Sequence, residues 1–206
     1  YKATQIQKLF NRSGIPPKFT GLSLDNFIQT PDNAVNLAKV KEFCLSLKNN
    51  LLCGHGLIFF GPKGTGKTHL SCAIAEIVIE QQMSALFLTA GDIADDVKEA
   101  FNGKQSEKSK IQKYTVPDLL IIDEILAGNG EFETKTIAKI LNTRYSQKRS
   151  TIIITNLDLL PPEDNPSAIT LASVIGERIM DRLREINKAI RFAGKSFRDR
   201  TNNLVK

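Results

Sequence analysis

The sequence predicts an α/β fold in which a parallel β-sheet is sandwiched by helices. Three short apolar segments carry this prediction, because polar residues follow each of them: residues 56–60, 119–122 and 151–154. A continuous apolar run is typical of a parallel strand that is buried on both faces. The carboxyl ends of parallel strands meet at one edge of an open α/β sheet, and ligands bind there. We therefore expect the polar residues after these segments to form one site.

The first apolar segment runs into a glycine-rich loop. Residues 61–68 fit the pattern G-x-x-x-x-G-K-[ST], in which the backbone folds around phosphate groups at the positive end of the helix that follows. That helix is expected to reach residue 80. Lys67 is expected to neutralise the β- and γ-phosphates, and Thr68 to hold Mg²⁺. The expected nucleotide-binding residues are Gly61, Pro62, Lys63, Gly64, Thr65, Gly66, Lys67, Thr68 and His69.

The second segment ends in two adjacent carboxylates, Asp123 and Glu124. A buried strand has little reason to end in this way unless its acids face a site. After a phosphate-binding loop, Asp123 is expected to bind Mg²⁺ through water, and Glu124 to orient and deprotonate an attacking water. The alternative is a strand that runs into a solvated loop. The expected cofactors are ATP or ADP and Mg²⁺.

The third segment is a β-branched run that stops at Thr155 and Asn156. Asn156 fits a residue that touches the attacking water or the γ-phosphate. Its alternative is an Asn that caps the turn before Leu157.

The other elements are expected from hydrophobic periodicity and from glycine and proline breakers. Residues 1–30 read as a polar linker segment, and residues 31–206 as the nucleotide-binding domain. A lysine-rich helical stretch occupies residues 92–113, and residues 157–168 form a proline-containing loop. Helices are expected over residues 32–48, 91–102, 133–147 and 171–186, and strands over residues 85–89 and 187–192.

The composition favours a partner that is a polyanion. The formal net charge is +6. Residues 176–206 hold nine Lys or Arg against four Asp or Glu, and residues 98–113 hold five Lys against two Glu. A local excess of positive charge favours phosphate backbones, because binding releases condensed counterions. For residues 98–113, a solvated helix face is the alternative.

Length and residue usage exclude several classes of protein. A chain of 206 residues holds one α/β domain with a full core, and no second large domain. The three cysteines lack C-x-x-C spacing, so neither a disulfide framework nor a zinc site is indicated. No apolar stretch reaches the length of a membrane span and no signal peptide is visible, so the cytoplasm is expected. Because residue 1 is Tyr, we expect the native chain to continue upstream.

Two arginines lie four residues apart in the helix expected over residues 171–186. Arg178 and Arg182 flank its apolar stripe, so both can project in one direction. Asp181 and Glu185 offer ion pairs within the helix, which would explain one arginine better than two. Near the end of the sequence, an arginine within residues 196–200 could fold back onto the nucleotide phosphates, and a basic solvated tail is the alternative.

This set of motifs resembles that of AAA+ ATPases, with Walker A at 61–68, Walker B at 118–124 and sensor 1 at Asn156. Four segments are more specifically similar to the bacterial DnaC family of replicative helicase loaders, and the resemblance runs from about Phe10 to Arg200. The four segments are residues 10–15, 64–70, 119–125 and 176–183.

The resemblance implies a P-loop AAA+ fold with a reduced C-terminal lid. It implies that Arg182 is an arginine finger, which reaches an ATP held by a neighbouring subunit, and that Arg198 is the sensor 2 residue. Lys98 and Phe101 would belong to an insertion that contacts single-stranded DNA by base stacking and phosphate neutralisation. Phe101 as an ordinary core residue is the alternative. The implied catalytic residues are Glu124, Lys67, Asn156, Arg182 and Arg198.

The function implied is that of a helicase loader, an ATPase that assembles into an oligomer on single-stranded DNA and places a DnaB-type helicase there. The resemblance implies that family members bind the helicase through an N-terminal domain, most or all of which is expected to be missing from this sequence. Three alternatives stay open: an IstB-like transposition helper, a DNA-binding adaptor switched by ATP, and a small-molecule P-loop kinase. The Asp123-Glu124 pair suits a water nucleophile better than an acceptor hydroxyl, which counts against the kinase.

Overall fold

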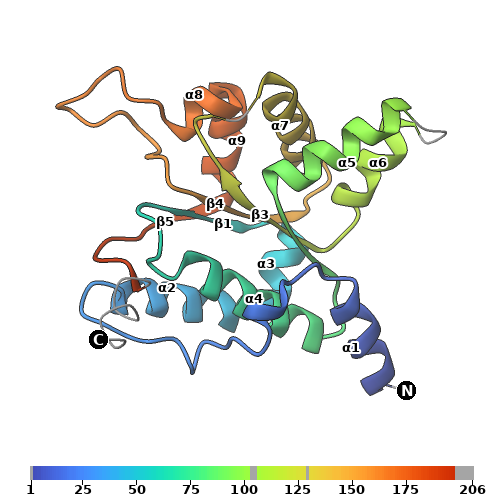
Figure 1. Ribbon diagram of the computed structural model, residues 1–206. Helices are drawn as coiled ribbons and strands as arrows, with labels where there is room; N and C mark the ends of the chain where they lie inside the picture. Colours follow the sequence, from blue (N-terminus) through green and yellow to red (C-terminus); the bar gives the residue numbers. More distant parts are fainter. Residues whose placement is uncertain (1, 103–105, 129, 198–206) are drawn as a thin grey trace, which may run out of the picture.

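The computed structural model describes residues 2–102, 106–128 and 130–197 (Figure 1). Within this part of the chain, parallel strands form a sheet in the order β2-β3-β4-β1-β5. The expected α/β class, with a parallel sheet between two layers of helices, is confirmed. The strands are β1 (Gly56–Phe60), β2 (Ala85–Thr89), β3 (Leu119–Ile125), β4 (Ser150–Thr155) and β5 (Asn187–Arg191).

Helices cover both faces of the sheet (Figure 1). One layer holds α1 (Lys2–Asn11), α2 (Ala34–Leu45), α3 (Leu47–Cys53) and α4 (Lys67–Glu80). The other holds α5 (Ala90–Asn102), α6 (Glu107–Thr115), α7 (Glu131–Ser146), α8 (Leu171–Ile175) and α9 (Glu177–Ile186).

Each strand supplies both layers of the core, because successive side chains point to opposite faces. In β3, Ile121 packs with the first layer of helices and Ile122 with the second. Both faces of the sheet are therefore dry, which is why the strands read as continuous apolar runs.

The register brings the polar ends of the strands together. Thr89 of β2 lies opposite Asp123 of β3, and Phe60 of β1 lies opposite Thr155 of β4. The glycine-rich loop leaves β1 at this same edge and enters α4. The edge that carries the expected site is thus formed by four neighbouring strands.

Two helix predictions are wrong in their extent. The helix expected over 171–186 is interrupted at Gly176, whose φ of 92° and ψ of 138° cannot continue an α-helix and favour glycine. The helix expected over 32–48 ends earlier, because the Asn50 side-chain amide donates a 2.9 Å hydrogen bond to the Phe43 carbonyl. That carbonyl would otherwise accept from residue 47 in a continuous helix, and α3 starts there instead.

The segment expected to be a linker packs on the core. Helix α1 lays Ile6, Leu9 and Phe10 against the buried cluster that includes α4. The 3₁₀-helix η1 (Pro17–Phe19) follows it, and Phe27 is buried in the same cluster. Residues 2–30 therefore contribute to the first helical layer.

Arg144 of α7 is fully buried and ties the start of the sheet together. Its guanidinium donates to the Thr151 hydroxyl at 2.9 Å and to the Tyr114 and Pro117 carbonyls, each at 3.0 Å. It also donates to the Ser150 carbonyl. The planar fork of five N–H donors suits a buried site lined by carbonyls, so Arg144 joins α7 to β4 and to the segment before β3.

Candidate active site

The glycine-rich loop has the shape of a phosphate cradle. Gly61, Gly64 and Gly66 have φ angles of 118°, 76° and 96°, a region that side chains disfavour. A Cβ atom on Gly66 would lie 2.6 Å from the Phe27 ring. Lys67, at the start of α4, donates to the Gly61 and Pro62 carbonyls at 2.6 Å each. The loop therefore keeps its lysine ammonium inside the cradle, where phosphate oxygens would accept from it.

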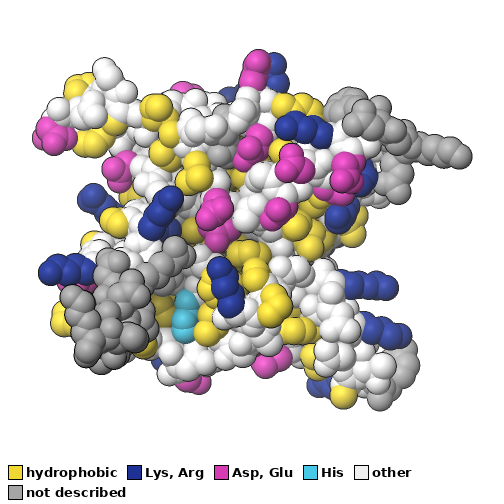
Figure 2. Space-filling model, in the orientation of Figure 1, with side chains coloured by type: hydrophobic (Ala, Val, Ile, Leu, Met, Phe, Trp, Pro, Cys, Tyr) yellow, Lys and Arg dark blue, Asp and Glu magenta, His cyan; other side chains and the backbone are white. Residues whose placement is uncertain are grey.

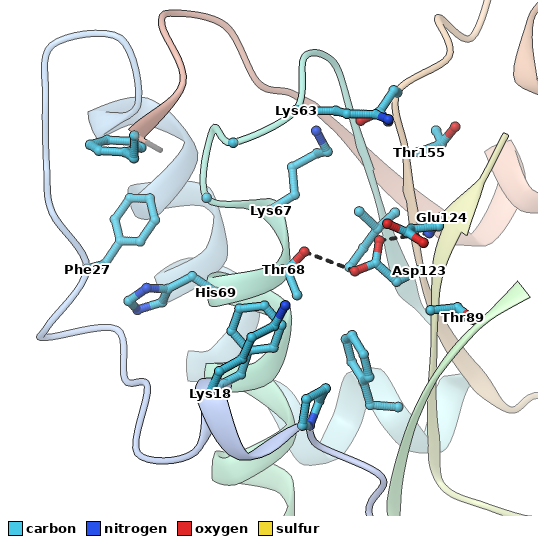
Figure 3. Close-up of a pocket in the computed structure, with 18 of the residues that line it drawn as sticks. Lys18, Phe27, Lys63, Lys67, Thr68, His69, Thr89, Asp123, Glu124 and Thr155 are labelled. Atoms are coloured by element: carbon cyan, nitrogen blue, oxygen red, sulfur yellow. Dashed lines mark hydrogen bonds between the residues drawn. The ribbon is translucent and has the colours of Figure 1, made fainter. Parts of the chain in front are cut away.

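Thr68 and Asp123 meet across the loop and the sheet. The Thr68 hydroxyl donates a 2.9 Å hydrogen bond to Asp123 Oδ2, which is drawn dashed in Figure 3. Burial raises the pKa of Asp123, and hydrogen bonds from Thr68 and from the Glu124 N–H oppose that change. A hydroxyl beside a buried carboxylate is an oxygen donor set of the kind that Mg²⁺ takes.

The carboxylates alone do not form a complete metal site. Among the described residues, no group of three or more His, Cys, Asp or Glu side chains could hold a metal ion. Mg²⁺ usually keeps one or two protein ligands and shares the rest with phosphates and water. The Thr68 and Asp123 pair fits that pattern.

Glu124 has an unusual backbone conformation. Its φ is 60°, in the left-handed region that non-glycine residues seldom occupy. Its N–H donates to Asp123 Oδ1 at 2.8 Å, and the ladder between β3 and β4 shifts register between Ile122 and Ile125. The kink exposes the Glu124 side chain while Asp123 stays buried. Strain of this kind, about 1–3 kcal/mol, is concentrated at functional sites.

Asn156 follows β4 and lines the same pocket as Glu124. The preceding residue, Thr155, donates from its hydroxyl to the Ile125 carbonyl at 2.6 Å and accepts from the Leu157 N–H at 3.1 Å. Thr155, rather than Asn156, therefore caps the turn before Leu157. The alternative role considered for Asn156 is thus filled by Thr155.

One pocket of about 560 Å³ joins these residues, and Figure 3 shows them around it. Six of the nine predicted nucleotide-binding residues line it: Lys63, Gly64, Gly66, Lys67, Thr68 and His69. Gly61 and Pro62 support Lys67 through their carbonyls, and the buried Thr65 hydroxyl donates to the Pro62 carbonyl at 2.9 Å.

Sequence reasoning did not identify the rest of the pocket wall. Thr89 lies at the carboxyl end of a predicted strand, so the rule that located Asp123 could have found it. The other lining residues come from the first 30 residues, from strand interiors and from the C-terminal segment, and no local pattern marks them. They are Pro16, Lys18, Phe19, Phe27, Ile28, Phe87, Ile154 and Phe197, whereas Thr155 is one of the polar residues expected at a strand end.

The C-terminal segment closes onto the loop. The Phe197 N–H donates to the Gly64 carbonyl at 2.8 Å, and a Cβ atom on Gly64 would overlap the Ser196 side chain. Arg198, the expected sensor 2 residue, lies outside the described residues. Phe197, the residue just before Arg198, thus contacts the glycine-rich loop.

Arg182 lies on α9, away from the pocket of its own chain. Its guanidinium carbon is 5.2 Å from the centre of the Tyr145 ring of α7, and the Tyr145 hydroxyl donates to Glu185 at 2.6 Å. Asp181 pairs with Arg184 at 3.4 Å. The ion pair considered for the helix therefore involves Arg184, and Arg182 rests on an aromatic ring.

In the folded chain, the lysine-rich stretch offers less free positive charge than the composition of residues 98–113 suggests. Lys98 lies 3.7 Å from Asp95 and 5.6 Å from the centre of the Phe132 ring. Lys110 and Lys113 both pair with Asp96, at 2.6 and 3.2 Å. From residue 92 to residue 113, five Lys face five Asp or Glu, so the net charge is zero.

Other observations fit this distribution of charge. Figure 2 shows carboxylates gathered over the part of this face where α5 and α7 lie. Phe101 lies in α5, and its side chain is outside the described residues. Three lysines of α5 and α6, Lys98, Lys110 and Lys113, therefore contact carboxylates of the same chain.

Asp96 fastens α6 to α5, and its replacement by asparagine should loosen this pair of helices. Burial raises the pKa of Asp96, but hydrogen bonds from Lys110, Tyr114 and Lys113 outweigh it and hold the pKa at about 2. A carboxyl group whose pKa is lowered by folding stabilises the fold at pH values above its usual pKa of 3.8. This contribution is lost as the pH falls from there through the pKa of the folded state. The variant should be less stable than the wild type at neutral pH.

The test is the free energy of unfolding by urea, measured for both proteins at neutral pH and at acid pH. The difference between them should shrink as the pH falls from 3.8 toward about 2. Asp95→Asn, in the same helix but highly exposed, is the matched control. A difference that stays constant across this range would contradict the role of the Asp96 charge.

Two further side chains, Cys72 and His69, are held by burial and by a backbone contact. Cys72 is buried, and burial raises the pKa of its thiol to about 12. His69 Nε2 lies 2.9 Å from the Ser23 carbonyl, and since a carbonyl only accepts, that nitrogen carries the proton. Along the described part of the chain, no helix is long and apolar enough to cross a membrane.

Comparison with known proteins finds relatives along most of the chain. The model of the family described as IstB-like ATP binding protein matches residues 38–205. The replicative helicase loader DnaC of Escherichia coli is 32% identical over 203 residues, which cover 97% of this chain and 78% of that protein. The loader DnaC of Buchnera aphidicola subsp. Baizongia pistaciae is 32% identical over 187 residues, which cover 89% and 71%.

Solved structures share the fold. A crystal structure of the DnaC helicase loader superposes with a TM-score of 0.73 at 23% identity and covers 86% of this chain and 100% of that one. The replication initiator DnaA bound to AMPPCP and single-stranded DNA has a TM-score of 0.67 at 22% identity, with 88% and 51% covered. This fold is therefore shared with a helicase loader and with a replication initiator.

Proposed function

Because the chain belongs to the family of IstB-like ATP-binding proteins and, within it, to the DnaC-type replicative helicase loaders, we propose that it uses ATP to place a replicative helicase on single-stranded DNA. ATP binding and ATPase activity are properties of this family of AAA+ proteins. The roles of single residues, Mg²⁺ and the macromolecular partners are the parts that we propose.

The observation that supports the proposal most is the meeting of five polar side chains in one pocket: Lys67, Thr68, Asp123, Glu124 and Asn156. Thr68 and Asp123 would hold Mg²⁺, which when bound supplies positive charge between the β- and γ-phosphates. Lys67 would exchange its carbonyl partners for phosphate oxygens. Glu124 would accept a proton from the attacking water, and Asn156 would orient that water.

We infer that a second chain completes the site. The described residues that line the pocket do not include Arg182, and an arginine at the transferred phosphate is worth about 10³ to 10⁵ in turnover in other nucleotide hydrolases. Arg182 of a neighbouring subunit would supply this charge, and Arg198 of the same chain would approach the phosphates as sensor 2. ATP would then hold adjacent subunits together.

The partners follow from the family. Single-stranded DNA would contact Lys98 and Phe101, and a DnaB-type helicase would be held mostly by a domain that precedes residues 1–30 in relatives. Residues 31–206 would be the AAA+ domain, and residues 2–30, which pack on it, would also connect it to that upstream domain. The cytoplasm is the compartment in which such loading would occur.

Steady-state ATP turnover, measured over a range of protein concentrations with and without single-stranded DNA, tests the proposal. Turnover per subunit should rise with concentration, because the finger acts between subunits, and it should respond to the DNA. The Lys67→Ala variant supplies the background rate. Flat turnover that ignores DNA would contradict the loader and favour an adaptor switched by ATP or a small-molecule enzyme.

A second candidate is a transposition helper, which the match to the IstB-like family model favours. Both functions would use the same pocket, so the nucleic acid distinguishes them. Competition between single-stranded and duplex DNA of equal length is the direct comparison. Preference for the single strand supports the loader, and preference for the duplex supports the helper.

A further inference from the structure

The segment Arg12–Ile28, which we name the N-terminal strap, runs across one side of the nucleotide pocket. At β2, the Phe87 N–H donates to the Ser13 carbonyl at 2.7 Å. At α4, Glu76 Oε1 accepts from the Gly21 N–H at 2.7 Å. Near the glycine-rich loop, His69 Nε2 lies 2.9 Å from the Ser23 carbonyl. The strap is thus fastened at three points to two elements of the site, β2 and α4.

The strap also forms part of the pocket wall. Five of its residues line the pocket: Pro16, Lys18, Phe19, Phe27 and Ile28. Phe27 is buried and contacts the His69 ring edge-on, with 5.1 Å between ring centres. A ligand in the pocket would therefore contact the strap as well as the glycine-rich loop.

Lys18 is the cation that the strap brings to this wall. It lies in η1, and its ammonium is 4.7 Å from the centre of the Phe19 ring. Figure 3 shows it extending from the strap on the side of the pocket where Thr68 and Thr89 lie, away from Lys63. Thr68 and Asp123 mark the end of the pocket that would receive the β- and γ-phosphates.

The charges in the pocket favour a role for this lysine. The lining carboxylates are Asp123 and Glu124, and the glycine-rich loop contributes Lys63 and Lys67. Lys18 adds a third ammonium from a segment distant in sequence. A flexible ammonium in a partly enclosed site is a typical point contact for a phosphate oxygen, and hydrogen bonds between charged groups are about twice as strong as neutral ones.

We propose that Lys18 is a further nucleotide-binding residue, which recognises the terminal phosphate of ATP and so holds the strap against the pocket. ADP lacks that phosphate, so the strap would be held less firmly in the ADP state. Since α1 leads directly into the strap, the nucleotide state would be transmitted to the N-terminal side of the chain. This inference rests on the proposed function, because it needs ATP in this pocket.

The test compares the affinities of Lys18→Ala for ATP and for ADP, using a slowly hydrolysed ATP analogue and ADP in the presence of Mg²⁺. Loss of one charge-assisted contact to the γ-phosphate should raise the Kd for the ATP analogue about tenfold. The Kd for ADP should change by less than about twofold. Lys18→Arg should restore most of the ATP affinity, because it keeps the charge.

Lys8→Ala, which removes an exposed lysine of α1, is the matched control and should bind both nucleotides as the wild type does. Hydrogen exchange of residues 12–28 gives a second readout. The ATP analogue should protect the strap more than ADP does in the wild type, and this extra protection should be absent in Lys18→Ala.

Each outcome decides one question. A wild type that binds neither nucleotide overturns the proposed function. A wild type that binds both, with a Lys18→Ala variant that loses neither or loses both equally, overturns the assignment of Lys18 to the terminal phosphate. Selective loss of ATP with rescue by arginine supports it, since a merely structural lysine would not distinguish the two nucleotides.

Discussion

Replacing Arg182 by alanine should leave ATP affinity close to that of the wild type and lower turnover by about 10³ to 10⁵. The guanidinium rests on the Tyr145 ring, 5.2 Å from its centre, and is not part of the pocket wall of its own chain. Binding within one chain should therefore survive its loss. Turnover and equilibrium nucleotide binding, measured on the same preparations, check the two halves of this expectation.

Mixing two inactive variants tests whether Arg182 acts between subunits. Chains that carry Arg182→Ala keep Glu124, and chains that carry Glu124→Gln keep Arg182. In a mixed assembly some pockets would hold both groups, so turnover should partly recover. Arg184→Ala, which removes an arginine of the same helix that pairs with Asp181, should keep near-normal turnover. Full activity of Arg182→Ala alone would remove Arg182 from the active site.

Replacing Glu124 by glutamine should lower turnover by about 10² to 10⁴, the usual effect of removing a general base. The amide is nearly the same size as the carboxylate, but it does not accept a proton from water. ATP should still bind, because Lys67, Thr68 and Asp123 are unchanged. Single-turnover hydrolysis, in which ATP is bound before the reaction starts, separates the chemical step from binding.

Glu163→Gln changes an exposed carboxylate in the loop after β4 and is the matched control for this variant. It should hydrolyse ATP at the wild-type rate. If Glu124→Gln turned over ATP as fast as this control, another group would have to be the base, and the strained backbone at Glu124 would need a different explanation.

The sheet and the centre of the site could be predicted because their signals are local. A strand buried on both faces is apolar along its whole length, and a phosphate loop needs glycines at fixed spacing. The chain therefore marks Lys67, Thr68, Asp123 and Glu124 without any knowledge of distant contacts. Their meeting in one pocket follows from parallel strands that end at one edge.

The parts that sequence reasoning missed depend on contacts between distant residues. The N-terminal strap has no periodicity, and hydrogen bonds to Phe87 and Glu76 position it. The break at Gly176 lies inside an apolar stripe that continues across it, so periodicity alone joins α8 to α9. No local pattern marks Arg144 as buried, yet it is buried with its guanidinium bonded to carbonyls from the segment before β3 and from β4.

The charge of α5 and α6 also could not be predicted from a count over a short stretch of sequence. A window that starts at Lys98 counts five lysines and omits the three aspartates of residues 92–96, which precede it in the same helix. Asp96, one of the three, holds two of those lysines in the folded chain. The exposed faces of α5 and α6 therefore offer less free positive charge to a nucleic acid than the composition indicates.

The pairing of Ser13 with Phe87 also affects how the protein behaves in solution. Strand β2 is at one end of the sheet, and strands in that position present unpaired backbone groups that can recruit strands of other molecules. Ser13 occupies the Phe87 N–H, and α1 covers nearby apolar surface. A shortened protein that started at residue 31 would expose both the backbone groups of β2 and the apolar surface under α1. It would therefore be prone to aggregate even with every phosphate-binding residue in place.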